Sequence, residues 1–167
     1  MTIAETLLPE LDHENGVTRR LLARFPEARH EWRPHARSFS AGQLATHLVN
    51  LATWGRLTLE TSQLELESPQ VQALERAAFT SRADALATFD EDVRRIRAAL
   101  ASATDAELLA PWTLYKGGTA MFTMPKVSVL RMFVMNHAVH HRGQLSVYLR
   151  LLDVPVPAMY GPSADER

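Results

Sequence analysis

The sequence predicts an all-α protein folded as an antiparallel four-helix bundle, and three observations support this. Four segments of about 20 residues repeat apolar side chains at the helical period of 3.6 residues. A strand-like pattern occurs in one loop alone, before the last of these segments. The 167 residues are the size of one domain, so we expect a single domain over residues 1–167. Helices with one apolar face each bury those faces by packing together.

Proline and a capping residue delimit the first two helices. The first is expected from about Ile3 to Phe25, because Pro26 cannot continue the hydrogen-bond ladder. Residues 27–39 show no period, which indicates a loop. The second helix is expected from Ser40, whose hydroxyl can accept a hydrogen bond from an early backbone N–H, to about Ser62.

Shorter signals surround the third helix. Residues 70–79 are compatible with a short helical turn. The third helix is expected from about Arg82 to Ala101, where Ser81 and Asp84 resemble a capping box. Thr104 can then cap one further turn before the next proline. Between the second and third helices we thus expect a polar break over residues 65–69, followed by that short turn.

The segment from Trp112 to Phe122 contains the strand-like pattern. Gly117-Gly118 divides it into two short extended pieces, which predicts a β-hairpin, and an irregular lid is the alternative. The fourth helix is expected from Pro125, which suits a first helical turn, to about Leu152. The expected fold is thus four helices with a short hairpin or irregular loop before the last one.

The fourth helical segment carries a His-x-x-x-His motif formed by His137 and His141. At 100° per residue the two side chains lie about 40° apart, on the inward side that also carries Phe133 and Tyr148. This separation suits two ring nitrogens on one cation, and a hydrogen-bonded pair of core histidines is the alternative. His140 lies toward the margin of the inward face. Of the two histidines that could pair with His137, it is therefore expected to be less buried than His141.

A third histidine favours the metal interpretation. His47 lies on the apolar face of the second expected helix. Three imidazoles on inward faces satisfy one another poorly by hydrogen bonds, and an unpartnered buried imidazole is costly. His47, His137 and His141 are therefore the candidate metal ligands, whereas His13 lies off its apolar stripe and is expected to be solvated. Imidazole suits Zn, Ni, Cu or Fe, and we expect a divalent ion, Zn or Ni first.

Other side chains near the motif are open to more than one interpretation. Gln144 and Tyr148 follow His141 inward, where they either line a pocket and orient a ligand histidine or pack as ordinary core residues. Arg142 points away on the helical wheel and is expected at the surface or in a dimer interface. A closed fourth coordination position would need a carboxylate from the first helix, such as Glu10 or Glu14.

Composition excludes several classes of partner. With 18 basic and 19 acidic residues the net charge is -1, without a long run of either sign. This argues against binding of nucleic acid or an anionic membrane surface and for a small-molecule or protein partner. Cysteine is absent, so any metal must use nitrogen or oxygen ligands. The acidic N-terminal residues are unlike a signal peptide and no segment is apolar enough to span a membrane, so we expect a cytoplasmic protein.

Three stretches carry a resemblance to a known family. They are Ser40–Leu48, Asn136–Leu145 and Leu149–Pro157. Together with the helical pattern over nearly the whole chain, they make the sequence similar to the DinB / YfiT-like family of metal-dependent four-helix proteins. The last stretch has Asp153 where the resemblance implies a glycine, so this helix is expected to end differently.

The resemblance implies a ligand set. One histidine on the second helix and a His-x-x-x-His pair on the fourth bind one divalent ion in that family. These positions fall on His47, His137 and His141 here, and His140 occupies a spacer position. The same residues are those indicated by the helical wheel.

The resemblance implies a reaction less specifically. Several relatives resemble transferases or isomerases that use a low-molecular-weight thiol such as bacillithiol or mycothiol. Three neutral imidazoles leave a cation its full charge and an open position, as in catalytic sites. We therefore expect a metal-dependent enzyme that transfers a low-molecular-weight thiol to an electrophilic small molecule. The alternative is a non-catalytic, metal-stabilised binding or stress-response module.

A two-fold homodimer is also expected. The resemblance implies dimers, and Trp32, Phe39 and Trp112 are apolar residues outside the helical stripes. They can pack across an interface between two copies, or they can cover the ends of the bundle.

Overall fold

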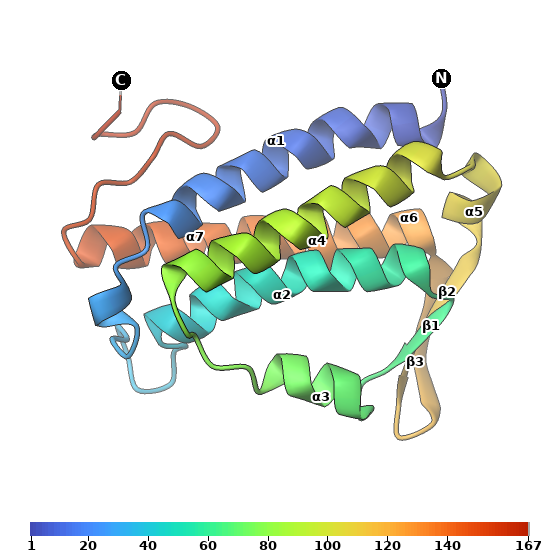
Figure 1. Ribbon diagram of the computed structural model, residues 1–167, viewed down its shortest axis with the longest axis horizontal. Coiled ribbons are helices and arrows are strands. Elements are labelled where there is room, and N and C mark those ends of the chain that lie inside the picture. The colour runs from blue at the N-terminus through green and yellow to red at the C-terminus, as the bar shows by residue number, and fades with distance from the viewer. Residues whose placement is uncertain (167) are drawn as a thin grey trace.

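The computed structural model describes residues 1–166, which are mainly helical (Figure 1). Three long helices are continuous: α1 (Ile3–Ala23), α2 (Ala41–Glu60) and α4 (Arg82–Ser102). The fourth is built from α6 (Lys126–Val129), the π-helical turn η2 (Leu130–Met135) and α7 (Asn136–Leu151). Short helices η1 (Glu27–Arg29), α3 (Pro69–Glu75) and α5 (Asp105–Leu109) lie in the connections. No helix within residues 1–166 combines the length and apolar character needed to cross a membrane.

The directions of the helices correct the prediction of an antiparallel bundle. Figure 1 shows that α1 and α7 run one way, whereas α2 and α4 both run the other way. The helix α4 packs on α2 and α1, and α7 packs on α2 and α1. The neighbours α2 and α4 are therefore parallel. This arises because the connection between them, residues 61–81, is long enough to return the chain to the end at which α2 began.

A small sheet corrects the prediction of an all-α fold. Its strands are β1 (Gln63–Glu65), β2 (Pro111–Lys116) and β3 (Thr119–Pro125), in the order β1-β2-β3. The hairpin of β2 and β3 confirms the prediction, and the turn residues Gly117 and Gly118 have positive φ values of 56° and 73°. β1 was not predicted, because three residues are too few for an alternating pattern and its pairing with β2 is parallel and distant in sequence.

Three of the predicted helix starts are confirmed by side-chain caps. Ser40 and Thr104 each accept a hydrogen bond from the backbone N–H three residues on, as part of complete capping boxes. Ser81 also caps α4, but the carboxylate of Asp84 accepts from the Ser81 hydroxyl rather than from its backbone. The first helix ends at Ala23, two residues before the predicted Phe25.

Two apolar clusters stabilise this arrangement. The larger lies between α1, α2, α4 and α7. The smaller lies under the sheet and includes Leu57, Val71 and Trp112. Trp112 is only 1% exposed, and its indole N–H donates to Thr61 Oγ1 at 3.2 Å. Trp112 therefore does not support the predicted dimer interface, since it is a core residue of the protomer.

The π-helical turn changes which side chains face inward. Hydrogen bonds from residue i to i+5 make each residue advance by less than the 100° of an α-helix. A wheel drawn at 100° therefore fails across η2. Phe133, predicted to face inward, is 41% exposed and stacks on Phe122 with ring centroids 4.7 Å apart. The histidines follow η2 on α7, where the α-helical period applies again.

The end of α7 corrects the expectation that Asp153, in place of a glycine, would make this helix end differently. This residue adopts a positive φ of 56°, the conformation that glycine usually takes after a helix. Its N–H donates to the carbonyl of Arg150 at 3.1 Å, and the N–H of Val154 donates to the carbonyl of Leu149 at 2.9 Å. The helix thus ends in the same type of motif that a glycine would give, formed here by aspartate.

Candidate metal centre

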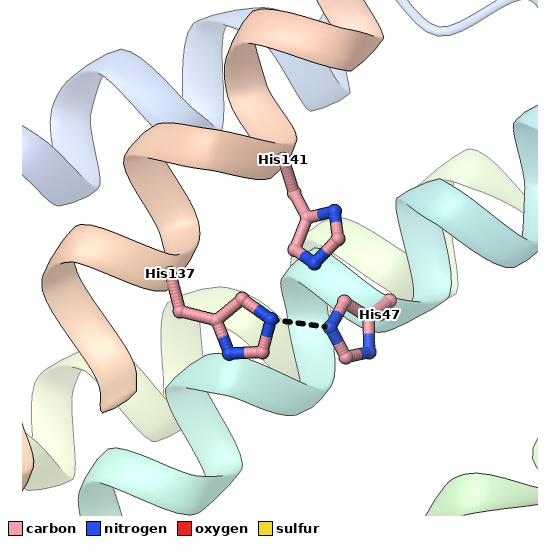
Figure 2. A group of neighbouring side chains, drawn as sticks. All are labelled: His47, His137 and His141. Carbon is pink, nitrogen blue, oxygen red and sulfur yellow. Dashed lines mark hydrogen bonds between the residues drawn. The ribbon is translucent and has the colours of Figure 1, made fainter. Parts of the chain in front are cut away.

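The structure brings together the three histidines that the sequence singled out. His47 comes from α2, and His137 and His141 come from successive turns of α7, which packs on α2. One ring nitrogen from each lies within 4.8 Å of those of the other two. Figure 2 shows the three rings converging between the two helices. His141 is buried, and the other two are half-buried.

The spacing of the ring nitrogens fits a shared cation better than a hydrogen bond. His47 Nε2 and His137 Nε2 are 3.4 Å apart, which is long for a hydrogen bond. Two nitrogens bound to one tetrahedral zinc at 2.0–2.1 Å would be separated by about 3.3 Å. The centroid of the His141 ring lies 4.4 Å from that of His47 and 4.7 Å from that of His137. The His47–His137 separation thus matches that of two ligands on one metal, and the third nitrogen lies within 4.8 Å of both.

Gln144 orients the most buried histidine. Its Oε1 lies 2.7 Å from His141 Nδ1, and an amide oxygen can only accept, so Nδ1 carries the hydrogen. His141 Nε2 then keeps its lone pair for a metal, the arrangement usual for ligand histidines. Gln144 Nε2 lies 3.2 Å from His140 Nε2 on the exposed side. His140 is thus outside the group of three, as its spacer position predicted.

Tyr148 influences the histidines indirectly, through Phe39. It is buried, and its hydroxyl donates to the backbone carbonyl of Phe39 at 3.1 Å. The ring of Phe39 lies 5.8 Å from that of His47 and 6.2 Å from that of His141. Tyr148 therefore holds the loop before α2 in the position where Phe39 flanks the histidines.

Burial keeps His47 and His141 uncharged. Desolvation, followed by the neighbouring His141 and His137, lowers the pKa of His47 to about 4. Desolvation also lowers the pKa of His141, against the effect of its hydrogen bond to Gln144. Both imidazoles are therefore neutral at pH 7, the form that can bind a metal.

The lowered pKa of His47 predicts an acid-sensitive metal-free protein. Between pH 6.5 and pH 4 the unfolded chain binds a proton at this position and the folded chain does not, so the free energy of unfolding should fall as the pH is lowered. For this partly exposed side chain we expect a loss of about 1–3 kcal/mol, measured by urea unfolding. A His47→Gln variant should have a flatter dependence over that range, and an equally steep one would contradict the assignment.

Among the described residues 1–166, no carboxylate of α1 lies with the histidines as a fourth ligand. Glu10 pairs with Arg131 at 2.5 Å, and Glu14 pairs with Arg142, so neither carboxylate joins the histidines. His13 on the same helix is exposed, as expected. The alternative of a closed site completed by α1 is therefore not favoured by the geometry.

Arg142 is a correction to the sequence interpretation. It was expected at the surface, but it is 1% exposed and forms an ion pair with Glu14. It also contacts the hydroxyl of Tyr160 in the C-terminal segment, and that hydroxyl donates to Glu14 Oε2 at 2.7 Å. Burial acts to raise the pKa of Glu14, but its hydrogen bonds with Arg142 and Tyr160 lower it overall. No local sequence signal indicated this pairing, because its members are far apart in the chain.

Two cavities border His47, and one of them also borders His137. A polar cleft of about 660 Å³ lies between the start of α2 and the segment after α3, and Gln43, His47 and Arg76 contribute to its walls. An apolar cavity of about 160 Å³ lies between α2, the sheet and the last helix, and it is bounded by His47 and His137. Glu75 borders both. His47 and His137 are thus accessible to small molecules.

Comparisons with known proteins bear on the fold and the family of the chain. A segment of 43 residues is 46% identical to the uncharacterised protein YrdA of Bacillus subtilis and spans 26% of this chain and 25% of that protein. A crystal structure of a DinB-like protein from Bacillus cereus has a TM-score of 0.72 and 24% identity, covering 95% of this chain and 98% of the other. The DinB-like protein YjoA of Bacillus subtilis has a TM-score of 0.65 and 16% identity, covering 97% and 99%. These two structures share the fold. The sequence profile of the DinB family matches residues 1–167, and the chain therefore belongs to the DinB family.

Proposed function

We propose that His47, His137 and His141 bind one divalent cation, Zn or Ni, and that the protein is a metal-dependent enzyme. The observation that carries the proposal is the convergence of three imidazole nitrogens, with the pKa of two of these histidines lowered by burial. Within residues 1–166 no carboxylate completes the group. A site with three neutral ligands leaves room for an exogenous molecule, which is typical of catalytic rather than structural metal sites.

The reaction that we propose is transfer of a low-molecular-weight thiol to an electrophilic small molecule. A divalent cation in this position would lower the pKa of a bound thiol and so supply a nucleophile near neutral pH. In the transfer the S–H bond breaks and its proton goes to solvent. The sulfur electron pair forms a C–S bond, and the leaving group departs with the electron pair of its own bond to carbon. The chain has no cysteine, so the sulfur must come from an external thiol.

The side chains around the histidines have supporting roles in this proposal. Gln144 fixes the ring of His141 through its Nδ1 hydrogen. Phe39, held by Tyr148, lies against the rings of His47 and His141 and narrows the access to them. The polar cleft, with Arg76 and Glu75 at its walls, is large enough for a polar thiol of the size of bacillithiol or mycothiol.

The competing function is a non-catalytic module in which the metal stabilises the bundle. The two cavities that reach His47 favour an enzyme, because a purely structural site does not need access for a small molecule. The partner that we propose is therefore a small-molecule substrate rather than nucleic acid or a membrane. The location that we propose is the cytoplasm.

We expect thiol transfer to depend on the metal and on its ligands. Metal-loaded protein should conjugate a biological thiol to an electrophile, and metal-stripped protein and His141→Ala should lose at least about tenfold in rate. His140→Ala is the matched control and should retain the rate. Activity should extend below the pKa of the free thiol, about 8.5, when rates are measured across a pH series. A metal that accepts no exogenous ligand, with no metal-dependent rate for any thiol tested, would support the structural module.

We also propose that the protein forms a homodimer. Of the three residues on which the sequence prediction depended, Trp112 is buried, whereas Phe39 is exposed beside the histidines. The outer face of α7 exposes Val139, Val147 and Leu151, which gives a second apolar surface for association. A monomer mass by light scattering at micromolar concentration would contradict this proposal.

A further inference from the structure

We infer that the apolar cavity beside His47 and His137 holds a compact hydrocarbon group, aromatic or branched aliphatic, of the electrophilic substrate. The reaction in which that substrate takes part rests on the proposed function. The cavity is a feature of the fold, formed where α2, the hairpin and the last helix meet. It can therefore be tested with and without a metal.

The chemistry of the walls selects an apolar group. Phe122 and Phe133 stack with nearly parallel rings, at an interplanar angle of 6°, along one side. Trp54 and Trp112 add further ring surface, and the indole N–H of Trp112 is already bonded to Thr61. The polar lining residues are His47, His137 and Glu75 alone. A polar group placed deep in the cavity would therefore lose its hydrogen bonds to water without replacement.

The volume limits the size of that group. The cavity measures about 160 Å³, and an apolar protein cavity of about 150 Å³ is large enough to bind benzene. One six-membered ring or a branched chain of similar size therefore fits, whereas a thiol cofactor that contains a sugar does not. Such a thiol fits the polar cleft of about 660 Å³, whose lining also includes His47.

The position of the cavity connects it to the chemistry. Two of the three candidate ligands, His47 and His137, form part of its wall. A hydrocarbon group that fills the cavity therefore brings its attached carbon next to the ligand nitrogens. The two substrates would then approach the centre from the two cavities, the electrophile from the apolar side and the thiol from the polar side.

Fluorobenzene is a suitable probe, because it has no metal-binding group and its signal is read by fluorine NMR. Metal-free protein should bind it saturably, with a dissociation constant in the millimolar range or tighter. Leu114→Trp, which fills the cavity from β2, should weaken binding at least tenfold, and Phe133→Ala, which removes a wall at an exposed position, should also weaken it. Leu109→Trp is the matched control at an exposed site outside the cavity and should bind as the original protein does. Absence of saturable binding, or equal affinity in Leu114→Trp, would overturn the inference.

A second measurement tests whether the cavity adjoins the metal. Protein loaded with Co²⁺ should relax the fluorine signal of bound fluorobenzene faster than protein loaded with Zn²⁺, because Co²⁺ is paramagnetic. Unchanged relaxation, with Co²⁺ coordinated by the histidines in its absorption spectrum, would overturn the inference. Failure of the protein to bind any metal would instead refute the proposed function, and the metal-free titration would still decide whether the cavity takes an apolar group.

Discussion

Replacing His137 with alanine is expected to lower the affinity for Zn²⁺ by about 100-fold or more. Loss of a partner that merely orients a ligand typically costs 10–100-fold, and loss of a ligand itself costs at least as much. His47→Ala and His141→Ala should behave in the same way, because each supplies one nitrogen to the group. Metal content by elemental analysis, with competition against a chelator, measures the effect.

His140→Ala provides the control for these variants. His140 lies on the same helix between two candidate ligands, but it is exposed and outside the group. We expect this variant to retain nearly full occupancy. Gln144→Leu should give an intermediate loss of about 10–100-fold, because it frees the His141 ring to rotate. Full occupancy in His137→Ala, or a loss confined to His140→Ala, would refute the ligand assignment.

Replacing Arg142 with methionine should lower the free energy of unfolding by about 3 kcal/mol. The arginine is 1% exposed, and its removal leaves the carboxylate of Glu14 partly buried without its cationic partner. The change also removes a contact to Tyr160 and so loosens the C-terminal segment from α1. Chemical unfolding at pH 7, followed by circular dichroism, gives the difference.

The chain offers a matched control for this prediction. Arg131 and Glu10 form a second ion pair between α1 and the last helix, but their side chains are 50% and 41% exposed. Arg131→Met should therefore cost less than about 1 kcal/mol. A double variant, Glu14→Gln with Arg142→Met, should recover part of the loss, because no uncompensated carboxylate remains. Equal losses in Arg142→Met and Arg131→Met would show that burial of the pair does not matter.

The sequence was sufficient to predict most of the helices and the candidate ligands, because the capping residues, the helical spacing and the turn glycines are local signals. Ser40 and Thr104 mark helix starts through bonds to residues three positions away. His137 and His141 face the same way because four residues complete little more than one helical turn. The hairpin followed from two adjacent glycines whose positive φ values a turn requires. Each of these features depends on residues within about one turn of the chain.

The sequence was insufficient where distant segments decide the outcome. The strand β1 exists because Leu64 lies opposite Leu114, and a three-residue strand has no stable form without that partner. The parallel arrangement of α2 and α4 depends on how residues 61–81 return along the bundle. The outward position of Phe133 depends on η2, for which neither proline nor glycine gives a signal.

The buried ion pair of the last helix separates what the sequence determined from what tertiary structure decided. From the sequence alone, the His47, His137 and His141 group was determined, since apolar periodicity fixes which face of a helix turns inward. Only the fold decided which charged side chain of the last helix is buried beside the histidine-bearing face. Arg142 is buried because Glu14, 128 positions away, is held opposite it by the packing of α1 against α7. A buried charge is tolerated only where such a partner is present, and no local pattern specifies that partner.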